Sequence, residues 1–267
     1  MSLNLAEQAE VINEAIADDP PEVGKPAPTT VKLMCGLLNP ETEEWQDTAV
    51  VAEMTGEDEE ELDRLTTVDN LSYADYTSAL LRRAVTSIGD VTVSDTPSVL
   101  DDLIIGDRDL LFLGVIRATY GNVRTFSVVC PKCDEKNEVR VNLDTDFEMD
   151  YPKSDPRETR PLTLRNGKTI KVKYLTGRDA SAIAASGDTP AVQNTEIVVH
   201  SVVWDDERTL LVRKKWAKAL SLADRRTIVK AVLGDQPGPR LEEVNAPCAY
   251  CSKEISMVLD WVSLLFG

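Results

Sequence analysis

The alternation of hydrophobic and polar positions divides the chain into an N-terminal arm and a longer folded body. Residues 3–19 place apolar side chains at helical spacing with glutamates between them, which predicts an amphipathic helix. Residues 20–30 (PPEVGKPAPTT) are too rich in proline for a packed element and predict an extended linker. The arm, residues 1–30, either docks its apolar stripe on a neighbouring molecule or is a frayed tail of the body.

The body mixes hairpins with helices, which predicts an α+β fold. Hairpins are expected from strands at 31–38 with 47–54, 123–129 with 138–143, 162–164 with 169–174, and in two runs around 248–251. Helices are expected at 57–65, 72–88, 97–104, 107–120, 193–204 and 221–232, with one more opening after Thr176. The polar stretch 144–160 contains two prolines and is expected to be a linker.

The order of these elements repeats along the chain. Thr55-Gly56-Glu57-Asp58 matches Thr176-Gly177-Arg178-Asp179 at an offset of 121, and Asp107-Arg108 matches Asp224-Arg225 at 117. Each series ends in a hairpin with a Cys-x-x-Cys turn. We therefore expect two tandem repeats, 31–150 and 151–267, each a β-hairpin plus helices plus a zinc-knuckle hairpin, packed with pseudo-two-fold symmetry. Two unrelated segments with a similar element order are the alternative.

Four of the five cysteines form the two Cys-x-x-Cys pairs Cys130/Cys133 and Cys248/Cys251. A structural zinc ion takes four ligands in a tetrahedron, and each pair at a hairpin tip supplies two thiolates at the spacing of a zinc knuckle. The sequence therefore predicts one Zn²⁺ shared by the two repeats. A redox pair and merely buried thiols are the alternatives. Cys35 stands alone in an apolar stretch and is expected in the core.

Charge changes the picture mainly for the arm and its surroundings. The chain has 267 residues and a net charge of −17, and residues 1–63 alone hold 17 acidic and two basic side chains. This balance argues against binding to nucleic acid or to an anionic membrane, both of which need a basic surface. No apolar run reaches the roughly 18–20 residues of a membrane span, and the acidic N-terminus is unlike a signal peptide. A cytosolic place of synthesis is expected.

Candidate catalytic groups are sparse. No glycine-rich phosphate loop is present, and the single histidine, His200, lies in an apolar helix where it aligns with Arg82 of the first repeat. We expect His200 to be a partnered helix residue, and we expect no enzyme activity. The acidic run Glu57–Glu61 and the basic cluster Arg213–Lys215 are expected to be solvated faces, the latter with a partner contact as the alternative. The apolar segment Trp261–Phe266 either packs on the core or anchors another subunit.

Several segments of the body, in their order along the chain, resemble one protein family. These segments are 69–90, 106–113, 118–121, 128–133, 139–143, the second hairpin, 176–179 and 248–251. They are similar to the baseplate hub or hub-assembly (chaperone) proteins of T-even-type contractile-tail phages and of related phage-tail-like injection systems. The resemblance spans 31–267 and implies a non-enzymatic protein, and all four paired cysteines match positions of the family. Ala249 stands where proline is usual, and the arm has no counterpart.

The leading expectation is thus a structural or assembly protein of a contractile tail baseplate, with an architectural zinc ion. Its expected partners are other tail and baseplate proteins, and no nucleic acid, membrane or small-molecule substrate is expected. It is expected in the baseplate of the virion tail, after assembly in the host cytoplasm. The alternative is a zinc-ribbon module in nucleic-acid machinery. That class should carry a basic stripe beside the knuckles, yet Asp134, Glu135 and Glu254 stand among the lysines there.

Overall fold

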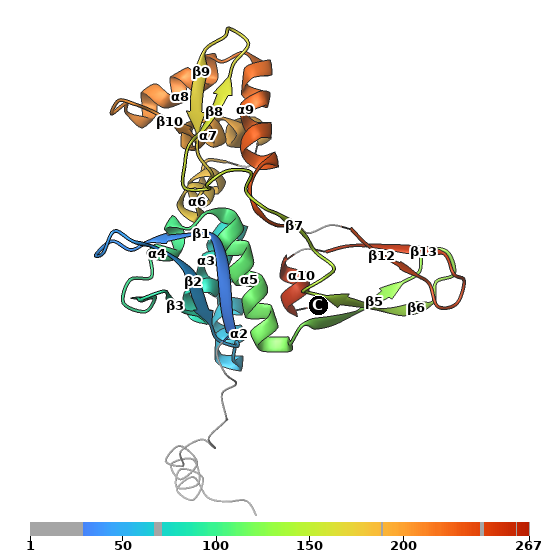
Figure 1. The fold of residues 1–267 in the computed structure, drawn as a ribbon. Helices are drawn as coiled ribbons and strands as arrows, with labels where there is room; N and C mark the ends of the chain where they lie inside the picture. Colours follow the sequence, from blue (N-terminus) through green and yellow to red (C-terminus); the bar gives the residue numbers. More distant parts are fainter. Residues whose placement is uncertain (1–28, 67–70, 188, 241–242, 260, 267) are drawn as a thin grey trace, which may run out of the picture.

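The computed structural model describes residues 29–66, 71–187, 189–240, 243–259 and 261–266, and the helix predicted at 3–19 lies outside this part of the chain. The protein is a mixed α+β structure, as predicted. Figure 1 shows three parts: a lower unit of β1 to α5, an upper unit of β8 to α9, and two hairpins that project together to one side. We call Thr29–Tyr120 the first unit and Arg160–Gly234 the second unit.

The first unit opens with a four-stranded antiparallel sheet in the order β1-β2-β3-β4. Its strands are β1 (Thr29–Leu38), β2 (Trp45–Val51), β3 (Val85–Ile88) and β4 (Val91–Thr92). The helices α2 (Gly56–Thr66) and α3 (Tyr73–Ala84) lie between β2 and β3. The prediction of one helix over 72–88 is wrong, because β-branched Val85 leaves the helix to pair with Val51 of β2.

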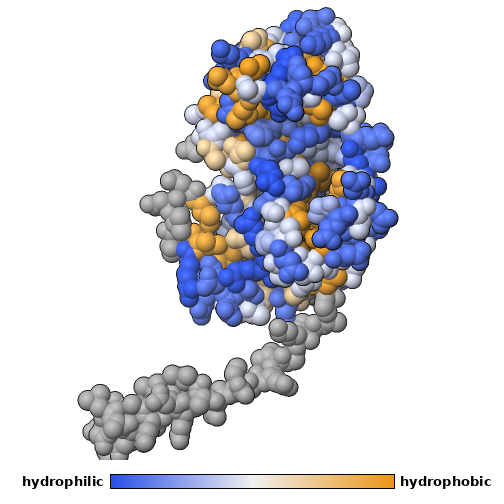
Figure 2. All heavy atoms as spheres, turned by 90° about the vertical axis from the view of Figure 1, so that its left-hand side faces the viewer, coloured by the Kyte–Doolittle hydropathy of each residue, from blue (hydrophilic) through white to orange (hydrophobic). Residues whose placement is uncertain are grey.

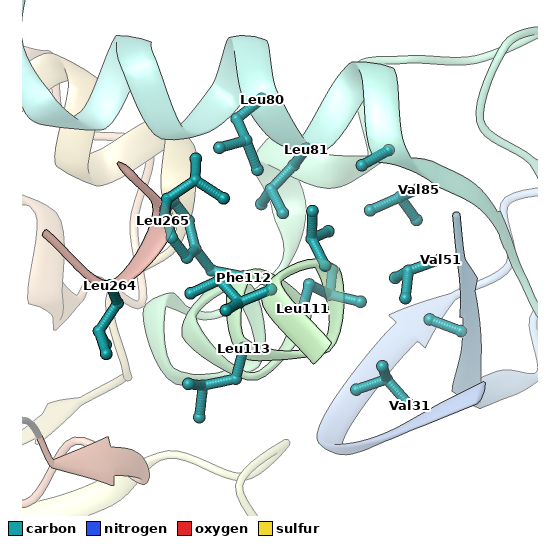
Figure 3. Close-up of a cluster of buried hydrophobic side chains, with 14 of the residues drawn as sticks. Val31, Val51, Leu80, Leu81, Val85, Leu111, Phe112, Leu113, Leu264 and Leu265 are labelled. Carbon is teal, nitrogen blue, oxygen red and sulfur yellow. The ribbon is translucent and has the colours of Figure 1, made fainter. Parts of the chain in front are cut away.

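The largest hydrophobic cluster is built around α5 (Ile105–Tyr120), which follows the short α4 (Val99–Asp102). Leu111, Phe112 and Ile116 of α5 have no solvent exposure. Leu80 and Leu81 of α3 point toward Leu111 and Phe112, as Figure 3 shows. The cluster continues into the hairpin of β5 (Val123–Val129) and β6 (Lys136–Asn142). The predicted helix at 107–120 is confirmed, with its start two residues earlier.

The second unit has a smaller core under a three-stranded sheet in the order β10-β9-β8. Its strands are β8 (Arg160–Thr163), β9 (Thr169–Val172) and β10 (Val202–Val203), and its helices are α6 (Gly177–Ala185), α7 (Pro190–Ser201), α8 (Leu210–Ala219) and α9 (Leu222–Gly234). A capping box between Thr176 and Asp179 starts α6. Sequence patterning did not predict α8, and α7 stops three residues before the predicted end because Val202 pairs with Val172.

The C-terminal segment returns to the first unit. The strands β12 (Glu243–Pro247) and β13 (Glu254–Val258) form a hairpin, and α10 (Trp261–Phe266) follows. Leu264 and Leu265 are buried in the large cluster, and the Trp261 ring lies 5.4 Å from the ring of Phe112. Of the two alternatives for this apolar segment, the structure therefore has it packed on the core.

Backbone contacts join the two units. The Ile105 N–H donates to the Leu175 carbonyl at 2.9 Å, and the Gly177 N–H donates to the Leu103 carbonyl at 3.0 Å. The predicted linker 144–160 also contains β7 (Glu148–Asp150), which pairs with β11 (Gly238–Arg240). The hydrophobic pattern did not predict this pairing, because each strand has only three residues and becomes a strand only by hydrogen bonding to the other. Glycine is required at Gly106, since an added Cβ would collide with the Pro237 carbonyl.

Much of the remaining surface is broken up by charge. On the face seen in Figure 2, hydrophobic side chains form separate groups on both units, with hydrophilic side chains between them. Leu210 and Leu211, at the start of α8, are 51% and 67% exposed. Along the described ranges, no helix combines the length and the apolar character that crossing a bilayer requires.

Candidate metal centre

Two hairpins carry the paired cysteines, and they lie side by side with their turns at the same end (Figure 1). Both turns have the same backbone design. The Cys130 N–H donates to the Glu135 carbonyl and the Cys248 N–H to the Lys253 carbonyl, at 2.9 and 2.8 Å. The residue after the second cysteine, Asp134 or Ser252, has a φ of 58°. The left-handed backbone at this residue lets each turn reverse direction within a few residues. Both thiols of each pair face the other hairpin in this arrangement.

The four thiol groups of Cys130, Cys133, Cys248 and Cys251 lie within 4.8 Å of one another. The closest approaches run between the hairpins, 3.8 Å from Cys130 Sγ to Cys251 Sγ and 3.6 Å from Cys133 Sγ to Cys248 Sγ. All four are free thiols, since a disulfide needs about 2.05 Å. A tetrahedron with metal–sulfur bonds of about 2.3 Å has edges of about 3.8 Å. The cluster therefore has the size and donor set that a metal ion with four sulfur ligands requires.

The ionisation of these thiols favours a bound cation. Burial alone raises the pKa of Cys248, but the backbone N–H groups of Cys251 and Tyr250, together with the thiols of Cys133 and Cys251, outweigh burial and lower it to about 6. The N–H of Glu135 favours the Cys133 thiolate, yet burial and the three neighbouring thiols raise the pKa of Cys133 to about 12. Four thiolates at this spacing repel one another, so a divalent cation is needed to hold all four in the deprotonated form.

A second layer of polar contacts connects the two turns. The Asn137 side chain donates to the Glu135 carbonyl at 2.9 Å, and its oxygen accepts the Ala249 N–H at 2.8 Å. Asn137 is only 7% exposed, so it ties one cysteine turn to the other inside the protein. Sequence analysis missed this residue, because a single asparagine beside a knuckle carries no spacing signal. Such supporting contacts orient the ligands of a metal site.

Other candidate residues lie away from the cluster. Cys35 is buried in the first unit, as predicted, and burial raises the pKa of its thiol to about 12. The Nδ1 atom of His200 lies 3.1 Å from Asp179 Oδ1, so the predicted partnered histidine is confirmed. The run Glu57–Glu61 is mostly exposed at the start of α2, and Lys214 of the basic cluster pairs with Glu196 at 2.8 Å.

These features define a class: a mixed α+β protein in which a cluster of four thiols brings together hairpins from distant parts of the chain. Sets of four cysteine ligands are typical of structural metal sites. A family model described as T4 bacteriophage base plate protein matches residues 44–267, so the chain belongs to that family. No curated protein and no solved structure gives a significant match.

Family membership gives the chain a structural place in a phage tail, in association with other tail proteins, and favours a non-enzymatic role. This agrees with the resemblance seen in the sequence at the level of the baseplate. The cysteine cluster adds a site that could hold a metal ion.

Proposed function

We propose that this protein is a structural or assembly protein of the hub region of a contractile-tail baseplate, in which one Zn²⁺ ion joins two related halves of the chain. The observation that carries the proposal is the convergence of four thiols from hairpins more than a hundred residues apart. Cys130, Cys133, Cys248 and Cys251 are the proposed ligands. An ion held by both hairpins fixes their relative orientation, and with it the surface offered to neighbouring tail proteins.

Zinc is favoured over other metals by the chemistry of the donors. Four thiolates in a tetrahedral arrangement suit Zn²⁺ or an iron–sulfur centre. Each pair here shares a tight turn, and the sulfur atoms lie 3.6–3.8 Å apart across the hairpins. That spacing fits a single small ion at the middle of the four sulfur atoms.

Matching contacts support the proposal that the halves are tandem repeats. Asp107 accepts hydrogen bonds from backbone N–H groups of strand β1, and Asp224 accepts one from the N–H of Arg165 in the turn between β8 and β9. The next residues, Arg108 and Arg225, each donate to a helix hydroxyl at 2.7 Å, that of Ser78 or Thr195.

The same helices also clarify the repeat alignment. Ser78 and Thr195 each donate to the carbonyl four residues earlier, and they are 117 positions apart, the offset of the Asp-Arg pair. At this offset His200 corresponds to Arg83, which contacts Asp58 at 3.0 Å as His200 contacts Asp179. The proposed repeat therefore aligns His200 with Arg83 and not with Arg82.

Metal analysis of the purified full chain tests the proposed centre. Protein prepared under reducing conditions should contain one zinc per chain by elemental mass spectrometry, because the four ligands make one closed tetrahedron. Cys35→Ser, which changes a cysteine outside the cluster, should keep the ion. Two ions per chain, iron in place of zinc, or no metal would contradict the shared zinc site.

The proposed place in the tail needs a separate measurement. Quantitative mass spectrometry of purified particles and of assembly intermediates should detect the chain among the baseplate proteins. Presence in finished particles assigns a structural subunit, and presence in intermediates alone assigns an assembly factor. A chain found in neither would contradict the baseplate role.

A further inference from the structure

An open apolar groove lies on the second unit between α7 and α9, with a volume of about 650 Å³. Its lining includes Leu222, Val229 and Leu233 of α9, together with Arg226 and Lys230 of the same helix. Leu222 is 71% exposed and Leu233 44% exposed, which is unusual for leucines that line a concave surface. Within the described residues, neither Arg226 nor Lys230 forms an ion pair, whereas Lys214 on α8 of the same unit pairs with Glu196.

The corresponding face of the first unit is covered. Phe112, Leu113 and Ile116 of α5 precede Val229, Lys230 and Leu233 of α9 by 117 positions. All three are at most 1% exposed, in a cluster that includes Leu264 and Leu265 of α10. Figure 3 shows Leu265 beside Phe112 and below the helix that carries Leu80 and Leu81. A short apolar helix thus completes the first unit, whereas the described part of the second unit supplies none.

We propose that the groove between α7 and α9 binds residues 3–19 of a second copy of this chain. The apolar residues Leu5, Ile12 and Ile16 recur at helical spacing and match a groove of this kind. Residues 1–28 hold six acidic side chains and one basic side chain. That charge is complementary to the cations Arg226 and Lys230 in the lining of the groove.

The length of the linker decides between the same chain and another copy. Residues 20–28 span at most about 32 Å when fully extended. The start of β1 lies at the end of the first unit that is farther from α7 and α9 (Figure 1). The ten residues of β1 alone cover roughly 33 Å, and the groove lies beyond them. The arm is therefore too short to fill the groove of its own chain and reaches that of a neighbour.

Complementation between two full-length variants tests the exchange. Ile12→Asp with Ile16→Asp disables the arm and leaves the groove intact, whereas Leu222→Asp with Leu233→Asp disables the groove and leaves the arm intact. Sedimentation velocity should show concentration-dependent association of the unchanged chain and a dissociation constant at least about tenfold weaker for each variant alone. An equimolar mixture of the two variants should restore a heterodimer, because it contains one working arm and one working groove.

Two controls make the result specific. Leu211→Asp changes a leucine of similar exposure on α8, outside the groove, and should associate like the unchanged chain. Arg226→Glu with Lys230→Glu should weaken association, and Glu10→Lys with Glu14→Lys in the arm should restore it. Zinc content should stay the same in every variant, which separates this inference from the metal centre.

Three outcomes would overturn the proposal. The unchanged chain could stay monomeric at all accessible concentrations, which would assign the groove to the chain's own arm or to a different protein. Groove variants could associate as strongly as the unchanged chain, which would place the contact elsewhere. The mixture of disabled-arm and disabled-groove chains could also stay monomeric, which would exclude the arm-into-groove pairing.

Discussion

The first and second units share a set of contacts but differ in how their neighbours cover them. Asp107 is fully buried and contacts three successive backbone N–H groups, whereas Asp224 is 8% exposed and accepts one such bond from Arg165. The helix after Asp107 is enclosed by α10 and the first cysteine hairpin, and the helix after Asp224 borders an open groove. One polar framework can therefore support a closed core or the wall of an open groove, depending on what packs against it.

The largest expected effect comes from breaking the proposed connection between the hairpins. Cys248→Ser removes one ligand, so the ion is lost and both cysteine hairpins lose their order together. We expect a loss of several kcal/mol of stability, because zinc binding contributes folding free energy directly. Hydrogen exchange should rise in β5–β6 as much as in β12–β13, although the substitution is in only one of them.

Cys35→Ser is the matched control, because it changes a buried cysteine that has no place in the cluster. It should leave exchange in both hairpins unchanged. If Cys248→Ser loosened only β12–β13, the two hairpins would be independent and the idea of a shared ion would fail.

The next largest effect should sharpen the contrast between the two aspartates. Asp107→Ala leaves the N–H groups of Met34, Cys35 and Gly36 without their acceptor in a buried place, at a cost on the order of 3–5 kcal/mol. Asp224→Ala removes the acceptor of the Arg165 N–H and of the Ser221 hydroxyl at the helix start, at a cost on the order of 1–2 kcal/mol. Urea unfolding of both variants measures the difference, and equal losses would show that burial does not separate the units.

A smaller effect is expected in acid. Burial alone raises the pKa of Asp179, but His200, Lys173 and the Thr176 N–H hold it well below its ordinary value. The ionised form is therefore favoured in the folded state, and its stabilisation is complete above the unfolded pKa of about 3.9 and is lost as the pH falls below it. Asp179→Asn should lower stability at pH 7 by on the order of 1–3 kcal/mol.

The stability of the Asp179→Asn variant should also fall less steeply than that of the unchanged chain between about pH 5 and pH 2. Thermal unfolding across this range, with Asp58→Asn as the counterpart in the first unit, measures that slope. The pKa of Asp58 is lowered too. Burial raises it, but hydrogen bonds from Thr55 and Arg83 and the charge of Arg83 outweigh burial. An Asp179→Asn chain with an unchanged acid slope would contradict this account.

The smallest effect concerns the ion pair between the units. Arg178 Nη2 lies 2.7 Å from Asp102 Oδ1, and both side chains are more than half exposed. Arg178→Ala should therefore change stability by no more than about 0.5 kcal/mol. A calorimetric melting curve measures this, and a loss of several kcal/mol would mean that this pair, and not the backbone bonds at Leu103 and Leu175, joins the units.

Local pattern predicted the elements whose signals are local. The Asn166-Gly167 turn, the capped start of α6 at Thr176 and the apolar face of α5 all lie where periodicity indicated. Where the secondary structure of a residue depends on a partner far away in the sequence, the prediction was wrong or missing. Val85 and Val202 prolong a helical pattern, yet each pairs with a strand of its own unit. The three-residue strands β7 and β11 have no pattern apart from their mutual pairing.

The cysteine cluster was predictable because Cys-x-x-Cys spacing can be read without knowledge of the rest of the fold, and a predicted repeat led to the expectation that the two pairs meet. Asn137, which ties the two turns together, could not be found in this way, since its role depends on the Ala249 N–H 112 residues later. The groove between α7 and α9 was equally hidden. Its lining comes from two separate helices, and the apolar helix α10 packs on the other unit.

The return of the C-terminal segment to the first unit imposes an order on folding during synthesis. The buried residues of the second unit's core fall between Leu164 and Val232, and the partly buried Ile105 and Leu162 that pack against it come earlier, so that core can close as soon as Val232 is available. The first unit must wait for β12, β13 and α10, although most of its own chain is made earlier. Until then the Phe112 face of α5 lacks the cover that α10 gives it, and the nascent chain presents an apolar surface there.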